Sequence, residues 1–193
     1  MKVAVIGTGF IGGVLGRSLA VSGHEVTFGS RHPDNDDVAG SSGGAVKRIG
    51  DALVDTDVII LAVPGGAVSA VTAEHGDLLG HKLVIDATNQ MGHAVANARS
   101  ALPPNVRYAR AFNTVGGENM AEPMFADGPA DMFFSAPDAD RGTVESVIEG
   151  VGLRPVYVGE DQEALIDALF QVWIALAMTQ GRGRRLALRL IDR

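Results

Sequence analysis

The chain has 193 residues, of which 46% are hydrophobic and 20% charged, and its formal net charge is −7. These values are typical of a globular domain with a core of its own, and the acidic balance argues against nucleic acid as the main partner. Because the sequence contains no cysteine, disulfides, thiolate catalysis and cysteine-based metal sites are excluded.

The first predicted element is a short apolar strand at residues 2–6, which leads directly into the pattern Gly7-x-Gly9-x-x-Gly12. A strand that enters this spacing, with a helical pattern behind it, is the fingerprint of a dinucleotide-binding unit. Gly7 would form the tight turn, Gly9 would let a pyrophosphate approach the backbone, and Gly12 would let the helix pack on the strand. The pyrophosphate would lie at a helix N-terminus, which favours an anion. The alternative is a glycine-rich turn without a ligand.

The second predicted strand, at residues 25–29, ends in Gly29-Ser30-Arg31. In an NAD site, an Asp or Glu at this place holds the 2′-hydroxyl of the ribose. Here no carboxylate occupies the tip, whereas Arg31 offers a permanently charged fork and Ser30 a hydroxyl donor to phosphate oxygens. We therefore expect NADP rather than NAD, with an ordinary surface arginine as the alternative. Acidic residues within 34–37 count against a strong anion site and are expected on a solvated loop.

Strands and helices continue to alternate along the chain. Helices are expected at residues 43–52, 66–78, 93–101, 138–149 and 161–180, and strands at residues 57–63, 82–86, 106–112, 132–135 and 153–158. This alternation predicts a Rossmann-type doubly wound parallel α/β sheet, whose ligands bind at the carboxyl ends of the strands. We expect an NADP-binding Rossmann-like domain at residues 1–160 and a helical C-terminal segment at residues 161–193.

Small or polar residues follow the later strands of this sheet. Val63 and Pro64 would place small groups against a ribose and a nicotinamide. Thr88, Asn89 and Asn113 carry neutral hydrogen-bonding groups suited to a carboxamide or a ribose hydroxyl. For the two asparagines the alternative is a helix N-cap or an Asx-turn. No catalytic side chain is predicted, since hydride transfer between two redox cofactors needs positioning and the exclusion of water.

Taken in order, these motifs resemble the NADPH-dependent reductases of coenzyme F420, an 8-hydroxy-5-deazaflavin, over essentially the full length. The motifs are the Gly-Thr-Gly-Phe-Ile-Gly run at 7–12, the strand ends at 29–31, 62–64, 86–89 and 111–114, and the C-terminal stretch at 165–184. The resemblance implies a role for each group of residues along the dinucleotide. The pyrophosphate would be wrapped by Thr8, Gly9, Phe10 and Ile11, and the 2′-phosphate would be bound by Ser30 and Arg31. The nicotinamide would be lined by Val63 and Pro64, and its carboxamide would be bordered by Ala111, Phe112 and Asn113. The resemblance implies NADP and coenzyme F420 as cofactors, with the deazaflavin stacked over the nicotinamide in a cleft closed by the C-terminal segment.

The sequence departs from the family pattern in three places. Acidic residues at 34–37 stand where a lysine often follows the Ser-Arg pair, Gly65-Gly66 stand where a bulky residue is common, and Arg110 stands where lysine is frequent. The two glycines would widen the entrance of the site, so that a hydride acceptor other than a deazaflavin could bind. One alternative is an NADPH-dependent reductase of a small imine, ketone or enone, with Asp86 or His93 as proton donor. Another is a non-catalytic redox sensor that binds NADP.

The C-terminal helix is apolar nearly all round between residues 164 and 178. A helix of this kind must be buried on several sides, so we expect a homodimer in which a partner chain covers it. The alternative is that the arginine-rich tail folds back over the helix.

The remaining features predict neither a metal site nor a membrane partner. The five histidines lack the spacing of a paired metal site. The apolar run at residues 3–6 is too short for a signal peptide, and the stretch at 164–178 is too short and too polar to cross a bilayer. We therefore expect a cytoplasmic protein that binds small molecules.

Overall fold

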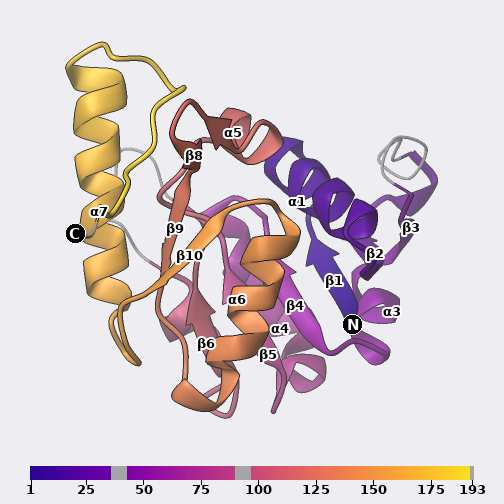
Figure 1. The fold of residues 1–193 in the computed structure, drawn as a ribbon. Coiled ribbons are helices and arrows are strands. Elements are labelled where there is room, and N and C mark those ends of the chain that lie inside the picture. Colours follow the sequence, from indigo (N-terminus) through magenta and orange to yellow (C-terminus); the bar gives the residue numbers. More distant parts are fainter. Residues whose placement is uncertain (36–42, 90–96, 192–193) are drawn as a thin grey trace.

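The computed structural model describes residues 1–35, 43–89 and 97–191. Within these ranges a parallel sheet of six strands runs in the order β3-β2-β1-β4-β5-β6 (Figure 1). Its strands are β1 (Lys2–Ile6), β2 (Glu25–Ser30), β3 (Ala45–Arg48), β4 (Val58–Leu61), β5 (Leu83–Asp86) and β6 (Arg107–Arg110). The strand order reverses between β1 and β4, and ligands of doubly wound sheets bind at this point. The Rossmann-type α/β fold predicted from the sequence is confirmed.

Helices cover both faces of the sheet, and the central strands supply a core to each face. The helices are α1 (Phe10–Val21), α3 (Ile49–Val54), α4 (Val68–Leu79), α5 (Gly117–Ala121), α6 (Arg141–Gly150) and α7 (Glu163–Ile174). Alternate side chains of one strand point to opposite faces, so Val58 and Ile60 join the core that contains α1 and α6 residues. Ile59 and Leu61 join the core on the side of α3 and α4. This two-sided burial explains why β4 is apolar throughout.

Two predicted helices differ from the structure. The helix expected at residues 43–52 is instead the edge strand β3 followed by α3. β3 pairs with β2 from Ala45 to Arg48, and its side chains are mostly exposed. A short, charged edge strand buries no apolar face, so its sequence carries no strand pattern. Of the helix expected at 93–101, residues up to 96 lie outside the described ranges, and Arg99–Ala101 form a 3-10 turn.

The last two predicted strands do not join the parallel sheet. β9 (Asp131–Phe134) and β10 (Arg154–Tyr157) pair in parallel with each other, and an antiparallel bridge between Arg110 and Ser135 connects them to β6. Between β6 and β9 the chain forms α5 and then a hairpin of β7 (Met124–Phe125) and β8 (Gly128–Pro129). The sequence did not predict these two short strands. This connection contains no helix that crosses the sheet, so β9 returns antiparallel to β6.

The C-terminal segment packs against this second part of the sheet. α7 continues as a π-helical turn at Ala175–Thr179, and the tail then runs back along the helix (Figure 1). Phe170, Trp173 and Ala177 form a small core of their own, against which Leu186 of the tail packs. The tail therefore covers one face of the helix, as the alternative interpretation of the sequence proposed.

None of the helices within the described ranges has the length and apolar character needed to cross a membrane.

Candidate functional site

The glycines after β1 have two different structural roles. Gly7 has a φ of +114°, and a Cβ there would lie 2.5 Å from the carbonyl oxygen of Ala62. A Cβ on Gly12 would collide with the carbonyl of Gly7. The fold itself therefore needs these two glycines. Gly9 has an ordinary φ of −69°, and no atom of the described residues lies within 4 Å of the place where its Cβ would stand.

Gly9 is also the N-cap of α1, whose N-terminus is open to a ligand. No side chain caps this end, and the first turn contains no acidic residue. The helix macrodipole and the unpaired N–H groups of a first turn favour an anion at such a place. The space above Gly9 and the electrostatics of the helix end therefore suit the same kind of group, a phosphate.

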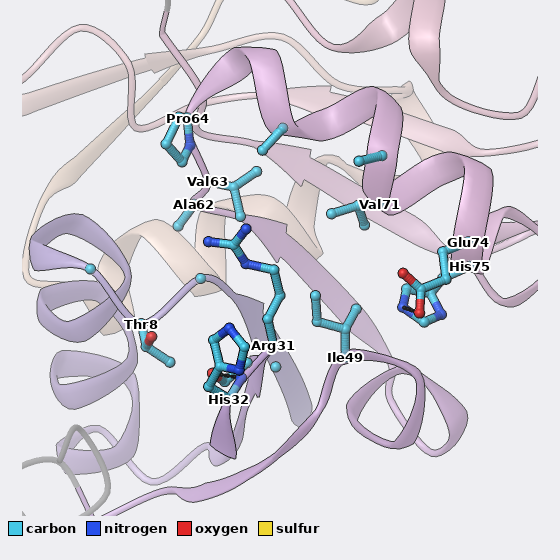
Figure 2. A pocket seen from close by; sticks show the side chains of 16 residues that line it. Thr8, Arg31, His32, Ile49, Ala62, Val63, Pro64, Val71, Glu74 and His75 are labelled. Atoms are coloured by element: carbon cyan, nitrogen blue, oxygen red, sulfur yellow. Dashed lines mark hydrogen bonds and ion pairs between the residues drawn. The ribbon is translucent and has the colours of Figure 1, made fainter. Parts of the chain in front are cut away.

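A first cavity of about 480 Å³ lies between this turn and the carboxyl ends of β2 and β4 (Figure 2). Arg31 extends across it toward Ala62 and Val63, with His32 at its side. Ser30 forms part of the wall, and its hydroxyl accepts a hydrogen bond from the backbone N–H of His32 at 3.0 Å. The tip of β2 contributes no carboxylate to the cavity. Its electrostatics therefore suit an anionic group beside Arg31.

Part of this lining was not predicted from the sequence. It consists of His32, Ile49, Ala67, Ala70, Val71, Glu74 and His75. Four of these residues lie on α4, where no motif marks them, although His32 could have been noticed from its place beside Arg31. Glu74 is the acidic residue of the lining. Its Oε1 lies 3.6 Å from Nε2 of His75, at the α4 side of the cavity (Figure 2). Of the acidic residues at 34–37, Asp36 and Asp37 lie outside the described ranges, and Asp34 does not line the cavity.

A second cavity of about 360 Å³ adjoins the first, and Gly9, Ala62, Val63 and Pro64 line both. Strand ends, the start of α1 and the C-terminal segment meet here. The remaining lining is Phe10, Ile11, Ala87, Asn89, Phe112, Asn113, Val115, Gly116, Gly117, Met120, Phe170, Trp173 and Arg184. These two neighbouring cavities lie along the carboxyl edge of the sheet and are together called the groove.

The structure brings most of the predicted site residues to this groove. Gly7, Thr8, Gly9, Ser30 and Arg31 line the first cavity, Val63 and Pro64 line both, and Phe10, Ile11, Asn89, Phe112 and Asn113 line the second. Gly12, Thr88 and Ala111 line neither. Thr88 and Ala111 are buried behind the groove, where each donates its backbone N–H to an oxygen of Asp86.

Aromatic side chains form the wall of the second cavity that faces the C-terminal segment. The rings of Phe170 and Trp173 are stacked with centroids 6.4 Å apart and planes 10° apart. The guanidinium of Arg184 lies over the Trp173 ring and donates to Glu118 at 2.7 Å, which lowers the pKa of that carboxyl. The indole N–H of Trp173 donates to the carbonyl of Leu186 at 2.9 Å. The tail thus completes the wall.

Asp86, expected as a possible proton donor, uses its carboxylate for contacts within the fold. Its carboxylate is fully buried and accepts hydrogen bonds from the backbone N–H groups of Thr88 and Ala98 and from the hydroxyl of Tyr108 at 2.7 Å. It also pairs with Arg110 at 3.2 Å. Burial beside this carboxylate raises the pKa of Tyr108 well above its usual value, so the tyrosine remains a donor. Asp86 does not line the groove, and the other expected donor, His93, lies outside the described residues.

The backbone directly after β6 is strained. Phe112 has a φ of +64°, and its N–H donates to the sulfur of Met132 at 3.1 Å. A left-handed conformation of a bulky residue costs on the order of 1–3 kcal/mol and persists only where the surroundings hold it. Both Phe112 and Asn113 line the second cavity, so this strain occurs within the candidate site.

Residues 2–90 match the family model described as NADP oxidoreductase coenzyme F420-dependent. A candidate F420-dependent NADP reductase from Arthrobacter sp. FB24 is similar over 100% of both chains, with a TM-score of 0.83 and 23% identity. An imine reductase from Streptomyces aurantiacus has a TM-score of 0.72 and 21% identity over 93% of this chain and 64% of its own. A reductive aminase from Aspergillus terreus, in complex with NADPH and ethyl levulinate, has a TM-score of 0.72 and 18% identity over 93% and 62%.

The solved structures share the fold, and the chain spans less than two thirds of the length of the last two. The family match covers the glycine turn, the end of β2 with Arg31, and the end of β4 with Val63 and Pro64. Residues 2–90 are thus similar to the coenzyme F420-dependent NADP oxidoreductases.

Proposed function

We propose that the protein transfers hydride between NADP(H) and a deazaflavin coenzyme, F420, and that the groove holds both. The observation that carries this proposal is that the two cavities are neighbours and share Gly9, Ala62, Val63 and Pro64 in their lining. A dinucleotide along the groove would place its 2′-phosphate beside Arg31 and its nicotinamide beside Asn113. The hydride donor would then face the aromatic wall of the second cavity.

The residues of the first cavity fit an NADP molecule. The open space at Gly9 and the uncapped start of α1 suit the pyrophosphate, with Thr8, Phe10 and Ile11 around it. Arg31 and Ser30 are donors at the tip of β2, where a 2′-phosphate would meet no carboxylate.

The residues of the second cavity suit a flat apolar ring. NADPH would supply the hydride, and the protein would hold the two reacting carbons in register while it keeps water out. Phe10, Phe112, Phe170 and Trp173 provide the apolar wall. In this proposal residues 1–160 form the cofactor domain, and the segment 161–193 closes the groove.

Reduction of a small imine or ketone is the second candidate, because the imine reductase and the reductive aminase share the fold. Such reactions commonly use a proton donor beside the acceptor. Among the described residues that line the second cavity, Arg184 is the one ionisable side chain, and an arginine does not give up its proton. The chemistry of this lining favours the deazaflavin.

We also propose a homodimer formed through the uncovered face of α7. Leu165, Val172 and Met178 are 53%, 47% and 51% exposed, although the tail covers the opposite face. They follow each other at helical spacing, with Ala168 and Ala175 between them. The same apolar face of α7 in a second copy of the chain could pack against these side chains.

The test of the activity is direct. NADPH and oxidised F420 are mixed with the protein, and the loss of the deazaflavin absorbance is followed. Bleaching that needs both the protein and NADPH supports the proposal. Turnover of a cyclic imine without bleaching would support the second candidate, and tight NADPH binding without turnover of either acceptor would indicate a redox sensor.

A further inference from the structure

A fully buried guanidinium connects the strand ends of the groove to α7. Arg110, at the end of β6, donates through Nε and Nη2 to Oδ1 of Asp167 at 2.9 and 2.8 Å. Its Nη1 donates to the carbonyl of Thr88 at 2.6 Å, and its Nη2 to Oδ1 of Asn89 at 3.3 Å. These contacts join β5, β6 and α7 at one point behind the second cavity.

The same network determines which way two amide side chains face. Asn89 presents Oδ1 to Arg110, which can only donate, so its Nδ2 faces the carbonyl of Asn113, at 3.0 Å. Both ends of the Asn89 amide are therefore occupied. Asn113 presents Nδ2 to Oδ1 of Asp167 at 3.4 Å, because a carboxylate can only accept.

This leaves one acceptor without a partner. Asn113 is 1% exposed and lines the second cavity, and its Oδ1 has no hydrogen-bond partner among the described residues. A buried amide oxygen without a partner is costly and uncommon in native structures. A ligand in the second cavity that offers an N–H group would satisfy it.

We propose that Asp167 is a positioning residue: Arg110 anchors its carboxylate, and the carboxylate keeps the Asn113 amide oxygen available to the second cavity. The cavity then selects a ligand with an N–H donor at this place and disfavours a carbonyl there. The inference rests on the proposed function, in which the donor is the carboxamide of the nicotinamide.

The experiment compares NADP⁺ with its 3-acetylpyridine analogue, in which an acetyl group of similar shape replaces the carboxamide and offers no N–H. Dissociation constants are measured by titration calorimetry. The wild-type chain is expected to prefer NADP⁺ by roughly three- to tenfold, as for one hydrogen bond to a neutral acceptor. If neither dinucleotide binds, the proposed function itself fails; if both bind equally well, the positioning inference alone fails.

The variant Asp167→Asn tests the positioning role. An amide at this position can donate as well as accept, so the Asn113 amide is free to turn and offer Nδ2, and the preference for NADP⁺ should fall to near one. Asp167→Glu, which keeps a carboxylate, should restore part of the preference. Asp161→Asn is the matched control: its exposed carboxylate pairs with Arg99 at 3.0 Å and makes no contact with Asn113, so the preference should remain.

If Asp167→Asn retains the wild-type preference, the inference is overturned. Should that chain not fold, Asn113→Ala decides, because it leaves the Arg110–Asp167 pair intact. It must lose the preference while its affinity for the acetylpyridine analogue changes little. An unchanged preference in Asn113→Ala contradicts the proposal as well.

Discussion

At Gly9 the effect of a substitution on ligand binding can be measured apart from its effect on the fold. Gly9→Val should abolish NADPH binding and leave the free energy of unfolding nearly unchanged, because its side chain would enter space that the described residues leave open. Titration calorimetry and urea unfolding measure the two effects. Gly142→Val, at an equally open position on α6, is the control that should bind NADPH normally. Normal binding by Gly9→Val would contradict the pyrophosphate site.

Arg31 is the residue on which the choice between the two dinucleotides depends. Arg31→Ala should weaken NADPH binding by roughly ten- to a hundredfold and NADH binding far less, since charge-assisted contacts are worth about 1.5–3 kcal/mol. Arg141→Ala removes an exposed arginine of α6, outside both cavities, and should change neither affinity. An unchanged ratio of the two dissociation constants in Arg31→Ala would reduce Arg31 to a surface charge.

His24 makes stability depend on pH. Burial lowers the pKa of His24, and its Nδ1 has no partner among the described residues. Below the unfolded value near pH 6.5 the unfolded chain binds a proton that the folded chain resists, so stability is lost as pH falls through this range. His24→Gln should show a smaller loss of unfolding free energy between pH 7.5 and 5.5 than the wild type. The exposed His32, changed to Gln, should leave the wild-type slope intact.

Among the elements, α5 and the tail depend on each other. Asn119 is 3% exposed and donates to the carbonyls of Arg184 and Leu186 at 3.0 and 2.8 Å. Asn119→Ala leaves both carbonyls without this donor and should raise the rate of tryptic cleavage in the tail roughly five- to thirtyfold, as for about 1–2 kcal/mol of local stability. Asn105→Ala, which removes an exposed amide near His81, is the control. Equal cleavage rates would show that Asn119 does not hold the tail.

The covering of α7 by the tail also changes the interpretation of Trp173. The sequence alone makes this residue a candidate for a dimer contact, but within one chain it is only 3% exposed and packs under Leu186. Trp173→Asp would place a charge in this small core and disturb the tail. It therefore reports on tail docking and not on assembly.

At the scale of the whole molecule, the exposed face of α7 predicts assembly into a dimer. Sedimentation equilibrium at low micromolar concentration should give about twice the chain mass of 20.1 kDa. Val172→Asp should shift the mass to that of one chain, because a charge at a desolvated interface is costly. Gln171→Asp, at the exposed neighbouring position, should leave the dimer intact. A wild-type mass near that of one chain would exclude the dimer at this concentration.

Local patterns in the sequence were enough to predict the buried strands of the parallel sheet and the glycine turn after the first strand. The strand at residues 2–6 and the apolar run of β4 are buried on both faces, and neighbouring residues show this burial as an apolar run. The glycine spacing is also a local signal, because a tight turn and a close approach of helix and strand need it. Because ligands bind at the carboxyl ends of parallel strands, the positions after β1, β2, β4, β5 and β6 could be selected as site candidates. Most of them do line the groove.

Only the tertiary structure decided which distant groups meet. The position of β3 depends on its pairing with β2, and the positions of β9 and β10 depend on their pairing with each other. No hydrophobic period in the sequence indicates either pairing. From the sequence Asp86 was a candidate proton donor, but in the structure Arg110, Tyr108 and two backbone N–H groups bind its carboxylate. Arg110 and Asp167 are 57 residues apart, and their pairing depends on how α7 docks on the strand ends. A local pattern specifies which face of an element is buried, whereas a contact between two buried charges depends on packing over the whole chain.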